Sequence, residues 1–353
     1  MRNHFAKEET MNIVIVAPPW FTMPPGAYGG IEWMCYWLIE GLSRRGHEVT
    51  LIGVESNQTS ARHFIRSYSE APSARLGEPF PEVAHAAVAG EAIASMAPDV
   101  VHDHTLAGPL LAFARPAPTV ITAHGPVDGE IGTYYRLLSS AVSIVAISDA
   151  QRAMAPDLAW LSTVYNAIPV EEYPFREDKE DFILWLGRMN PEKAPHIAID
   201  VAREVGRPIV LAGKCNEPEE REYFRREIEP RLGPGVEWTG EAGTERKKDL
   251  LARASCFLFP VQWEEPFGIV MVEAMACGTP VVALRAGSVP EVVVDGVTGF
   301  ICDEPSELAE AIGKSDAIDR HGCRDWVGRR FDVDAMVDGY EDAYAQAAGQ
   351  GRA

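Results

Sequence analysis

Two glutamates stand at the ends of an otherwise apolar stretch in the segment EEPFGIVMVEAMACGTPVVA, which covers residues 264–283. Glu265 and Glu273 are separated by seven residues, nearly all of them apolar. An ionised carboxylate accepts two or more hydrogen bonds, so a pair of carboxylates suits a ligand that is rich in hydroxyl groups. The alternative is that both charges face solvent, one before a helix and one on it.

The residues around this pair predict a strand, a loop and a helix. The run SCFLFP at 255–260 predicts a buried strand, and a helix is expected from about residue 268 to 277, where glycine and proline end it. Glu265 is then in the loop at the carboxyl end of the strand, and Glu273 is on the helix. The first amides of a helix have no intrahelical acceptor and can donate to a ligand. Here they belong to Phe267, Gly268 and Ile269.

A second candidate site lies in the segment LWLGRMNPEKAP, residues 184–195. Arg188 and Lys193 follow a predicted strand and stand at the mouth of a predicted helix. Two cations beside free helix amides favour the binding of a diphosphate. The alternative is a pair of surface cations without a ligand.

A glycine-bearing loop, PPGAYGGIE at 24–32, connects the first predicted strand to the first predicted helix. Gly29 and Gly30 would let a ligand approach the backbone closely because no Cβ intervenes, although a simple turn at the helix start is an equal alternative. The loop does not match G-x-G-x-x-G, which disfavours a dinucleotide-dependent oxidoreductase. The aromatic cluster that follows has helical spacing, which predicts core packing over an acceptor platform. Its members are Trp33, Tyr36 and Trp37.

Three histidines follow or lie on predicted strands of the first half. His124 comes at the end of PTVITAHG, residues 118–125, and therefore at the edge of the expected sheet. A structural histidine is the alternative to a functional one. His102 and His104 lie two residues apart on one face of the strand DVVHDH. Two ligands without a third make a metal site weak, so an acceptor-side or structural role is favoured.

Short apolar runs alternate with amphipathic stretches from end to end, which predicts parallel strands covered by helices on both faces. The pattern restarts at 181–188, after a polar and proline-bearing linker at 164–181. We therefore predict an α/β chain of two Rossmann-like, doubly wound domains facing across a cleft, where ligands bind. The predicted ranges are 1–170, 171–330 and a closing helix within 331–353 that packs back towards the first domain.

Composition excludes several classes of protein. The net charge of -20 opposes binding to nucleic acid or anionic lipid. The six cysteines form no CxxC pair, as in a reduced cytoplasmic protein. No apolar run reaches the roughly 18 residues that a membrane span needs. The basic, aromatic segment 61–68 leaves peripheral lipid contact as a disfavoured alternative, and residues 1–10 predict a disordered leader, with Met11 as the alternative start.

The segment EPFGIVMVE, continued by AMACGTPVVALRAGSVPEVVVDGVTGF, resembles the E-x7-E signature of family-4 glycosyltransferases. These are retaining enzymes of the GT-B fold. The resemblance is contiguous over residues 265–300 and extends more loosely over most of the chain. It implies transfer of a sugar from a nucleotide-diphosphate donor to a hydroxyl acceptor, with no metal ion and no cofactor.

The resemblance also implies roles for individual residues. Glu265 would contact the donor sugar, Glu273 the ribose, and Glu241 the nucleobase. Glu291 would lie at a further helix start near the donor. Arg188 and Lys193 would hold the departing diphosphate, and Gly29 and Gly30 would approach the donor phosphate. The amides of Phe267, Gly268 and Ile269 would bind sugar hydroxyls or phosphate. His124 would lie at the reaction centre.

The resemblance therefore implies a metal-independent, retaining hexosyltransferase. One alternative is another enzyme on this scaffold, such as a sugar-nucleotide epimerase or a phosphorylase, although no pyridoxal-binding lysine motif stands out. The other alternative is a non-catalytic binder of nucleotide sugars. The presence of four charged residues argues against it, namely Glu265, Glu273, Arg188 and Lys193. The stretches at about 55–95 and 125–140 are expected to be acceptor-side loops and carry no motif.

Overall fold

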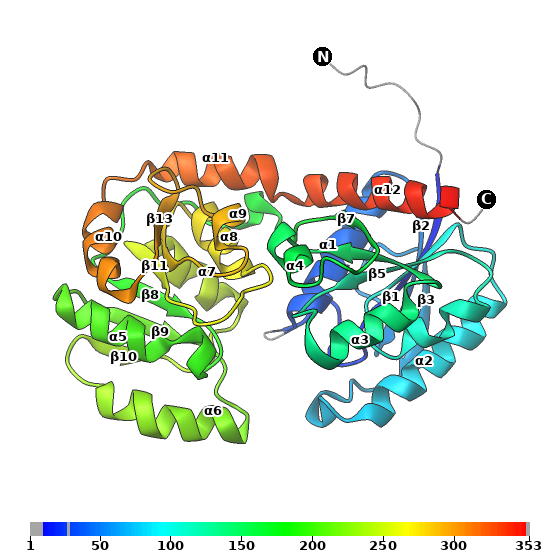
Figure 1. The fold of residues 1–353 in the computed structure, drawn as a ribbon, viewed down its shortest axis with the longest axis horizontal. Coiled ribbons are helices and arrows are strands. Elements are labelled where there is room, and N and C mark those ends of the chain that lie inside the picture. Colours follow the sequence, from blue (N-terminus) through cyan, green and yellow to red (C-terminus); the bar gives the residue numbers. More distant parts are fainter. Residues whose placement is uncertain (1–9, 27–28, 351–353) are drawn as a thin grey trace, which may run out of the picture.

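The first of two parallel sheets spans the amino-terminal half of the protein, whose computed structural model describes residues 10–26 and 29–350 (Figure 1). Its strand order is β3-β2-β1-β4-β5-β6-β7, and every pair of neighbours is parallel. We call this sheet with its helices the first unit. Its strands are β1 (Asn12–Val16), β2 (Glu48–Val54), β3 (His63–Tyr68), β4 (Val100–Asp103), β5 (Thr119–Ala123), β6 (Val142–Ala146) and β7 (Trp160–Thr163).

The second unit repeats the same winding. Its strand order is β10-β9-β8-β11-β12-β13, again parallel throughout. The strands are β8 (Ile183–Leu186), β9 (Ile209–Ala212), β10 (Val236–Trp238), β11 (Cys256–Phe259), β12 (Val281–Leu284) and β13 (Gly299–Cys302).

The central strands are buried along their whole length, as their unbroken apolar runs require. Helices cover both faces of each sheet in Figure 1. In the first unit they are α1 (Gly30–Arg44), α2 (Pro79–Ala94), α3 (Gly129–Leu138) and α4 (Asp149–Met154). The second unit has α5 (Pro195–Glu204), α6 (Pro218–Tyr223), α7 (Thr244–Arg253), α8 (Ile269–Ala276), α9 (Val289–Val292), α10 (Leu308–Ser315) and α11 (Arg320–Arg330).

The strand order reverses between β1 and β4 and again between β8 and β11. Such switch points open a crevice at the carboxyl ends of the strands, where ligands of doubly wound folds bind. The two Rossmann-like units predicted from the sequence are thus confirmed.

The last helix, α12 (Val333–Gln350), returns to the first unit. Figure 1 shows α11 above the second unit and α12 above the first, joined end to end. The contact of α12 with α1 is close, because a Cβ added to Gly41 would lie 2.5 Å from Cγ2 of Val337. Glu341 of α12 also accepts from Arg45 at 2.6 Å and pairs with His47 at 2.7 Å. The closing helix therefore fixes the carboxyl-terminal part of the chain to the first sheet.

Two expectations about loops were wrong. The stretch 55–95 contains strand β3 and helix α2, and 125–140 contains helix α3. The basic segment at 61–68 includes β3, which pairs with β2 at the edge of the sheet. Helix α2 begins with proline and is rich in alanine, which are ordinary helix signals.

The remaining expectations concern the domain boundary, the leader and membrane spans. The domain boundary near residue 170 stays a prediction. Residues 1–9 of the expected leader lie outside the described ranges. Among the helices that the structure describes, none has both the length and the hydropathy that crossing a bilayer requires.

Candidate active site

A cavity of about 630 Å³ lies between the carboxyl ends of the two sheets. The first unit contributes the loops after β1 and β5, and the second unit those after β8, β9, β10 and β11. Of the residues that the sequence places near the donor or the reaction centre, all but Glu291 line this cavity, which we call the cleft. They are Gly29, Gly30, His124, Arg188, Lys193, Glu241, Glu265, Phe267, Gly268, Ile269 and Glu273.

Glu265 connects two of the predicted motifs. It lies in the loop between β11 and α8 and is only 7% exposed, so it is not a solvent-facing charge. Its Oε2 atom is ion-paired with Nζ of Lys193 and accepts a hydrogen bond from Nε1 of Trp263 at 2.9 Å. The same lysine lies 4.7 Å from the centre of the Trp263 ring, which adds a cation–π attraction.

A neighbouring turn fixes the loop that carries Glu265. The backbone N–H of Ser288 donates to the carbonyl of Glu265 at 2.9 Å, and its hydroxyl donates to that of Phe267 at 2.9 Å. A Cβ added to Gly287 would lie 2.5 Å from the backbone N of Glu265. Only glycine therefore allows the turn to approach so closely.

Helix α8 begins at this loop. Its N-cap residue Gly268 has φ of 71°, a left-handed conformation that favours glycine. The first amides of the helix have no intrahelical acceptor, and they meet the cleft at a terminus with partial positive charge. An anion or a sugar hydroxyl in the cleft can therefore accept from them.

Glu273 is also buried, with 2% of its surface exposed. Its Oε1 atom accepts from the hydroxyl of Tyr173 at 2.8 Å and from Nζ of Lys247 at 2.6 Å. Its Oε2 atom is buried and has no partner among the described residues. A buried carboxylate oxygen without a donor is costly, so a ligand hydroxyl at this position would stabilise it.

The two predicted cations lie on the same side of the cleft. Lys193 is partly buried beside Glu265, whereas Arg188 forms no ion pair within the described part of the chain. Lys214 and, more weakly, Arg188 lower the pKa of the exposed carboxyl of Glu217. The charge of Arg188 is thus largely uncompensated at close range and is suited to an anionic ligand.

His124 faces these groups from the first unit. Its Nε2 atom lies 2.9 Å from Nδ1 of His104. Burial lowers the pKa of His124 to about 4, so the ring is neutral at pH 7. A neutral imidazole keeps one N–H group, which can donate to a ligand.

His102 has a structural role. Its two ring nitrogens bond to the hydroxyls of Tyr344 and Thr122, each at 2.8 Å. Burial holds the pKa of both His102 and His104 well below the usual value. Both nitrogens of His102 are used, so the weak metal alternative has no support from this residue.

The predicted glycines differ in their surroundings. Gly29 has φ of 140°, and an added Cβ would lie 2.8 Å from Cβ of Pro25. Gly30 begins α1, and a Cβ there would meet nothing within 4 Å. Gly29 is therefore needed for the turn, whereas the space beside Gly30 is open. Glu241 is exposed at the rim, with Nδ2 of Asn216 at 3.3 Å from its carboxylate.

Three charged residues of the cleft were missed by sequence reasoning. Glu32, in the first turn of α1, lines the cleft with 3% exposure, Lys214 lines it after β9, and Lys247 of α7 holds Glu273. The signal for Lys247 was a cation in a first helical turn after a strand, as for Lys193. Trp33 and Trp37 also line the cleft, so the expectation of core packing was incomplete.

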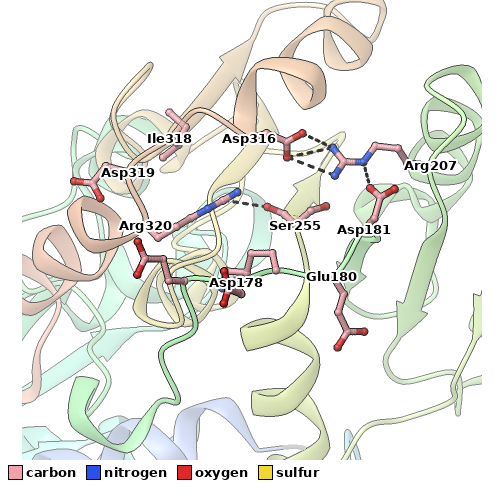
Figure 2. Close-up of a pocket in the computed structure, with 11 residues that line it drawn as sticks. Asp178, Glu180, Asp181, Arg207, Ser255, Asp316, Ile318, Asp319 and Arg320 are labelled. Carbon is pink, nitrogen blue, oxygen red and sulfur yellow. Dashed lines mark hydrogen bonds and ion pairs between the residues drawn. The ribbon is translucent and has the colours of Figure 1, made fainter.

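Figure 2 shows a second hollow, of about 460 Å³, beside the amino ends of β8 and β11. Its cations are already used. Arg207 bonds to Asp181 at 2.8 Å and to Asp316 at 3.2 Å, and Arg320 donates to the carbonyl of Ser255 at 3.1 Å. The other charged side chains that line it are mainly acidic. The chemistry-bearing residues therefore gather in the cleft and not here.

Comparison with known proteins identifies the family of the chain. The family model described as Glycosyltransferase Family 4 matches residues 28–172, and that described as Glycosyl transferases group 1 matches residues 171–315. The chain is 30% identical to the alpha-maltose-1-phosphate synthase of Mycobacterium tuberculosis, over 59% of this chain and 65% of that protein. It spans 58–66% of the length of the maltose-1-phosphate and glycogen synthases that it matches.

Solved structures share the fold over nearly the whole chain. A glycosyltransferase involved in avilamycin A biosynthesis superposes with a TM-score of 0.71 and 25% identity, covering 96% of this chain and 98% of that one. An Anabaena protein solved in complex with UDP and glucose gives a TM-score of 0.73 at 20% identity, over 95% and 99% of the two chains. The two family matches lie end to end on the two units, and the chain belongs to the family-4 glycosyltransferases of the GT-B fold.

Proposed function

We propose that the protein is a retaining glycosyltransferase that moves a hexose-type sugar from a nucleotide-diphosphate sugar to an acceptor hydroxyl without a metal ion. One observation carries this proposal. Glu265, Lys193 and Arg188 meet in one cleft with the buried, half-satisfied carboxylate of Glu273. This set combines acceptors for sugar hydroxyls with cations for a diphosphate.

The donor would lie against the second unit. The unpaired Oε2 of Glu273 is suited to a ribose hydroxyl, and Glu265 with the first amides of α8 is suited to the sugar. Lys193 has three N–H donors, so it can keep its bond to Glu265 and still donate to a phosphate. Glu241 at the rim is assigned to the nucleobase, and Gly29 and Gly30 to the phosphates from across the cleft.

The reaction breaks the bond between the anomeric carbon and the diphosphate oxygen, through an oxocarbenium-like transition state. Arg188 and Lys193 would stabilise the negative charge that develops on the departing diphosphate, which makes a metal ion unnecessary. In a front-face attack the acceptor hydroxyl would bond to the anomeric carbon on the side that the diphosphate leaves, and its proton would pass to the departing phosphate oxygen. A covalent enzyme intermediate is the alternative route to retention. The neutral His124 would donate a hydrogen bond to the sugar near the reaction centre.

The solved structures and the curated relatives indicate which nucleotide to test first. The Anabaena protein was solved with UDP and with glucose, and curated relatives are named glycogen synthase and D-inositol 3-phosphate glycosyltransferase. UDP is therefore the first nucleotide to test, followed by GDP, ADP and dTDP.

The test measures melting temperature with each nucleotide diphosphate, with and without Mg²⁺. A ligand at about 100 times its Kd adds roughly 2.7 kcal/mol of stability. We expect one nucleotide to raise the melting temperature without metal, and Arg188→Ala and Lys193→Ala to abolish both this shift and transfer. Arg225→Ala is the control, because Arg225 is an exposed residue that forms its ion pair with Glu222, away from the cleft lining.

Unchanged transfer by the Arg188 and Lys193 variants would contradict the diphosphate assignment. Interconversion of a free UDP-sugar without an acceptor would indicate an epimerase, and phosphate-dependent cleavage of a glucan would indicate a phosphorylase. Nucleotide binding without transfer to any acceptor would favour a non-catalytic binder.

A further inference from the structure

The two walls of the cleft differ in charge. The basic side chains that line it all belong to the second unit and are Arg188, Lys193, Lys214 and Lys247. Within the described residues, the first unit contributes no lysine or arginine to the lining. We call the side of the cleft formed by the first unit the first wall and the side formed by the second unit the second wall. An anionic group held against the first wall would therefore lose water without gaining a counter-charge, which is costly.

The first wall presents aromatic surface instead. Trp33 and Trp37 lie one turn apart on α1, and their rings stack with centroids 5.1 Å apart and planes 28° apart. Trp33 is partly exposed, and Leu76 extends the apolar surface with 42% of its own surface exposed. A flat indole of this kind packs well against the apolar face of a ring.

Two polar groups are set into this apolar wall. Nε1 of Trp37 is buried and has no acceptor among the described residues. Glu32 is 3% exposed and forms no ion pair in the part of the chain that the structure describes. An unpaired buried donor and a buried carboxyl without a cation both suit the hydroxyls of an uncharged ligand.

Glu32 also opposes an anion directly. Burial raises its pKa to about 7, although a hydrogen bond from its own backbone lowers it again in part. Near neutral pH the carboxyl can therefore accept a hydrogen bond as the carboxylate or donate one as the acid. A phosphate placed beside it would either meet a like charge or force the carboxyl to stay protonated.

We propose that the first wall binds an uncharged, hydroxylated ring compound as the acceptor, with its apolar face against Trp33 and a hydroxyl bonded to Glu32. This inference rests on the proposed function, because it names the class of acceptor. Phosphate esters are excluded as acceptors by the same arrangement. The shared chemistry of the class is a neutral ring with one apolar face, found in simple glycosides and in aryl glycosides.

The test measures binding to the full chain that has been saturated with UDP, so that the cations of the second wall are already occupied. The probes are methyl glucoside, phenyl glucoside and two phosphate esters of glucose, titrated by calorimetry. We expect Kd values for the neutral glucosides at least tenfold lower than those for the phosphate esters. Equal or tighter binding of a phosphate ester, or no binding of either glucoside, would overturn the proposal.

Two variants show where the probes bind. Trp33→Ala should weaken glucoside binding at least tenfold, whereas the control Trp160→Phe, on β7 outside the cleft lining, should leave it unchanged. Leu76→Lys adds a cation to the first wall and should create binding of a phosphate ester. A variant without this gain would show that the acceptor does not lie against this wall.

The UDP titration itself separates the two proposals. If no nucleotide binds, the proposed function fails and the acceptor question does not arise. If UDP binds and raises the melting temperature while both glucosides fail, only the inference about the acceptor is wrong.

Discussion

Nδ1 of His104 lies 2.9 Å from Nε2 of His124, and the other ring nitrogen of His104 is buried without a partner in the part of the chain that the structure describes. One of the two rings must donate in this contact. If His104 donates, its unpaired nitrogen is an acceptor and not an orphaned N–H group. His124 then carries its proton on Nδ1, from which it can donate to the sugar.

We expect His104→Leu to lower kcat about fivefold, because one hydrogen bond contributes roughly 1 kcal/mol. UDP binding should change little, because His104 belongs to the first unit and does not itself line the cleft. Transfer kinetics and a UDP melting shift check the two halves of this expectation. The control is His63→Leu, an exposed residue on β3. Equal loss of kcat in both variants would contradict a positioning role for His104.

The ion pair between Lys247 and Glu273 separates stability from binding. Lys247→Met should destabilise the protein by about 3 kcal/mol, because it leaves a buried carboxylate with only the Tyr173 hydroxyl. Adding Glu273→Leu should restore much of this stability, since the lone charge is gone. Nucleotide binding should stay lost in the double variant.

Melting temperatures and UDP titrations of the two single variants and the double variant test this. A double variant that regains stability and still binds UDP would remove Glu273 from the ribose site. If the double variant does not regain stability, the unpaired charge of Glu273 is not the cause of the destabilisation by Lys247→Met.

Gly287 allows the backbone of Glu265 to lie close to it because glycine has no Cβ. Gly287→Ala places a Cβ against the backbone of Glu265, so the loop before α8 must shift and Glu265 must leave its position. We expect at least a tenfold loss of kcat/KM. The control is Gly296→Ala, because Gly296 also has a left-handed φ, 71° against 52° at Gly287, with nothing within 4 Å of the added Cβ. Equal effects in both variants would indicate backbone strain and not displacement of Glu265.

Glu291 connects the two units. Its carboxylate accepts from the backbone N–H groups of Asp149 at 2.8 Å and Ala150 at 2.7 Å, and from the hydroxyl of Tyr165 at 2.9 Å. It does not line the cleft, and its expected place near the donor stays a prediction. The sequence places it correctly at a helix start, but the helix that it caps belongs to the other unit.

Glu291→Ala should therefore favour an opened arrangement of the two units. We expect a larger radius of gyration by small-angle X-ray scattering and a severalfold higher KM for the donor, because charge-assisted bonds to a helix start are lost. Glu237→Ala, at an exposed position on β10, is the control. An unchanged radius with unchanged KM would show that the contact does not hold the units together.

The sequence predicted the elements that carry strong local patterns. Continuous apolar runs gave the central strands of both sheets, and the E-x7-E segment placed Glu265 and Glu273 on a loop and a helix. These patterns are local, because a buried parallel strand and a helix start each have their own residue signals. The strands β3 and β7 were missed, because edge strands are only partly buried and therefore lack an unbroken apolar run.

Contacts between distant segments could not be predicted. Lys247 pairs with Glu273 across 26 positions, and His102 meets Tyr344 across 242. Glu32 looks like an ordinary first-turn acid on α1, and only the packing of the cleft buries it. Helix position alone does not tell which charged residue loses its water.

Glu32 makes stability depend on pH in a direction opposite to that of most carboxylates. Its pKa rises from 4.5 to about 7 on folding, so the folded state binds more protons than the unfolded state between these values. Stability from this group is therefore present below pH 4.5 and is lost as the pH rises to about 7. Glu32→Gln removes this loss. The melting temperature of the variant, relative to that of the wild type, should therefore rise between pH 4.5 and about 7 and stay higher above pH 7.

The gain from Glu32→Gln should reach at most roughly 3 kcal/mol, since each unit of pKa is worth about 1.36 kcal/mol. Thermal unfolding at four pH values from 5 to 8 measures it. The control is Glu245→Gln, which changes a first-turn glutamate that is exposed on α7 and should show no such trend. A difference between Glu32→Gln and wild type that stays constant with pH would mean that Glu32 keeps its charge in the cleft. The first wall would then repel anions through a permanent carboxylate and would accept, but not donate, hydrogen bonds from this group.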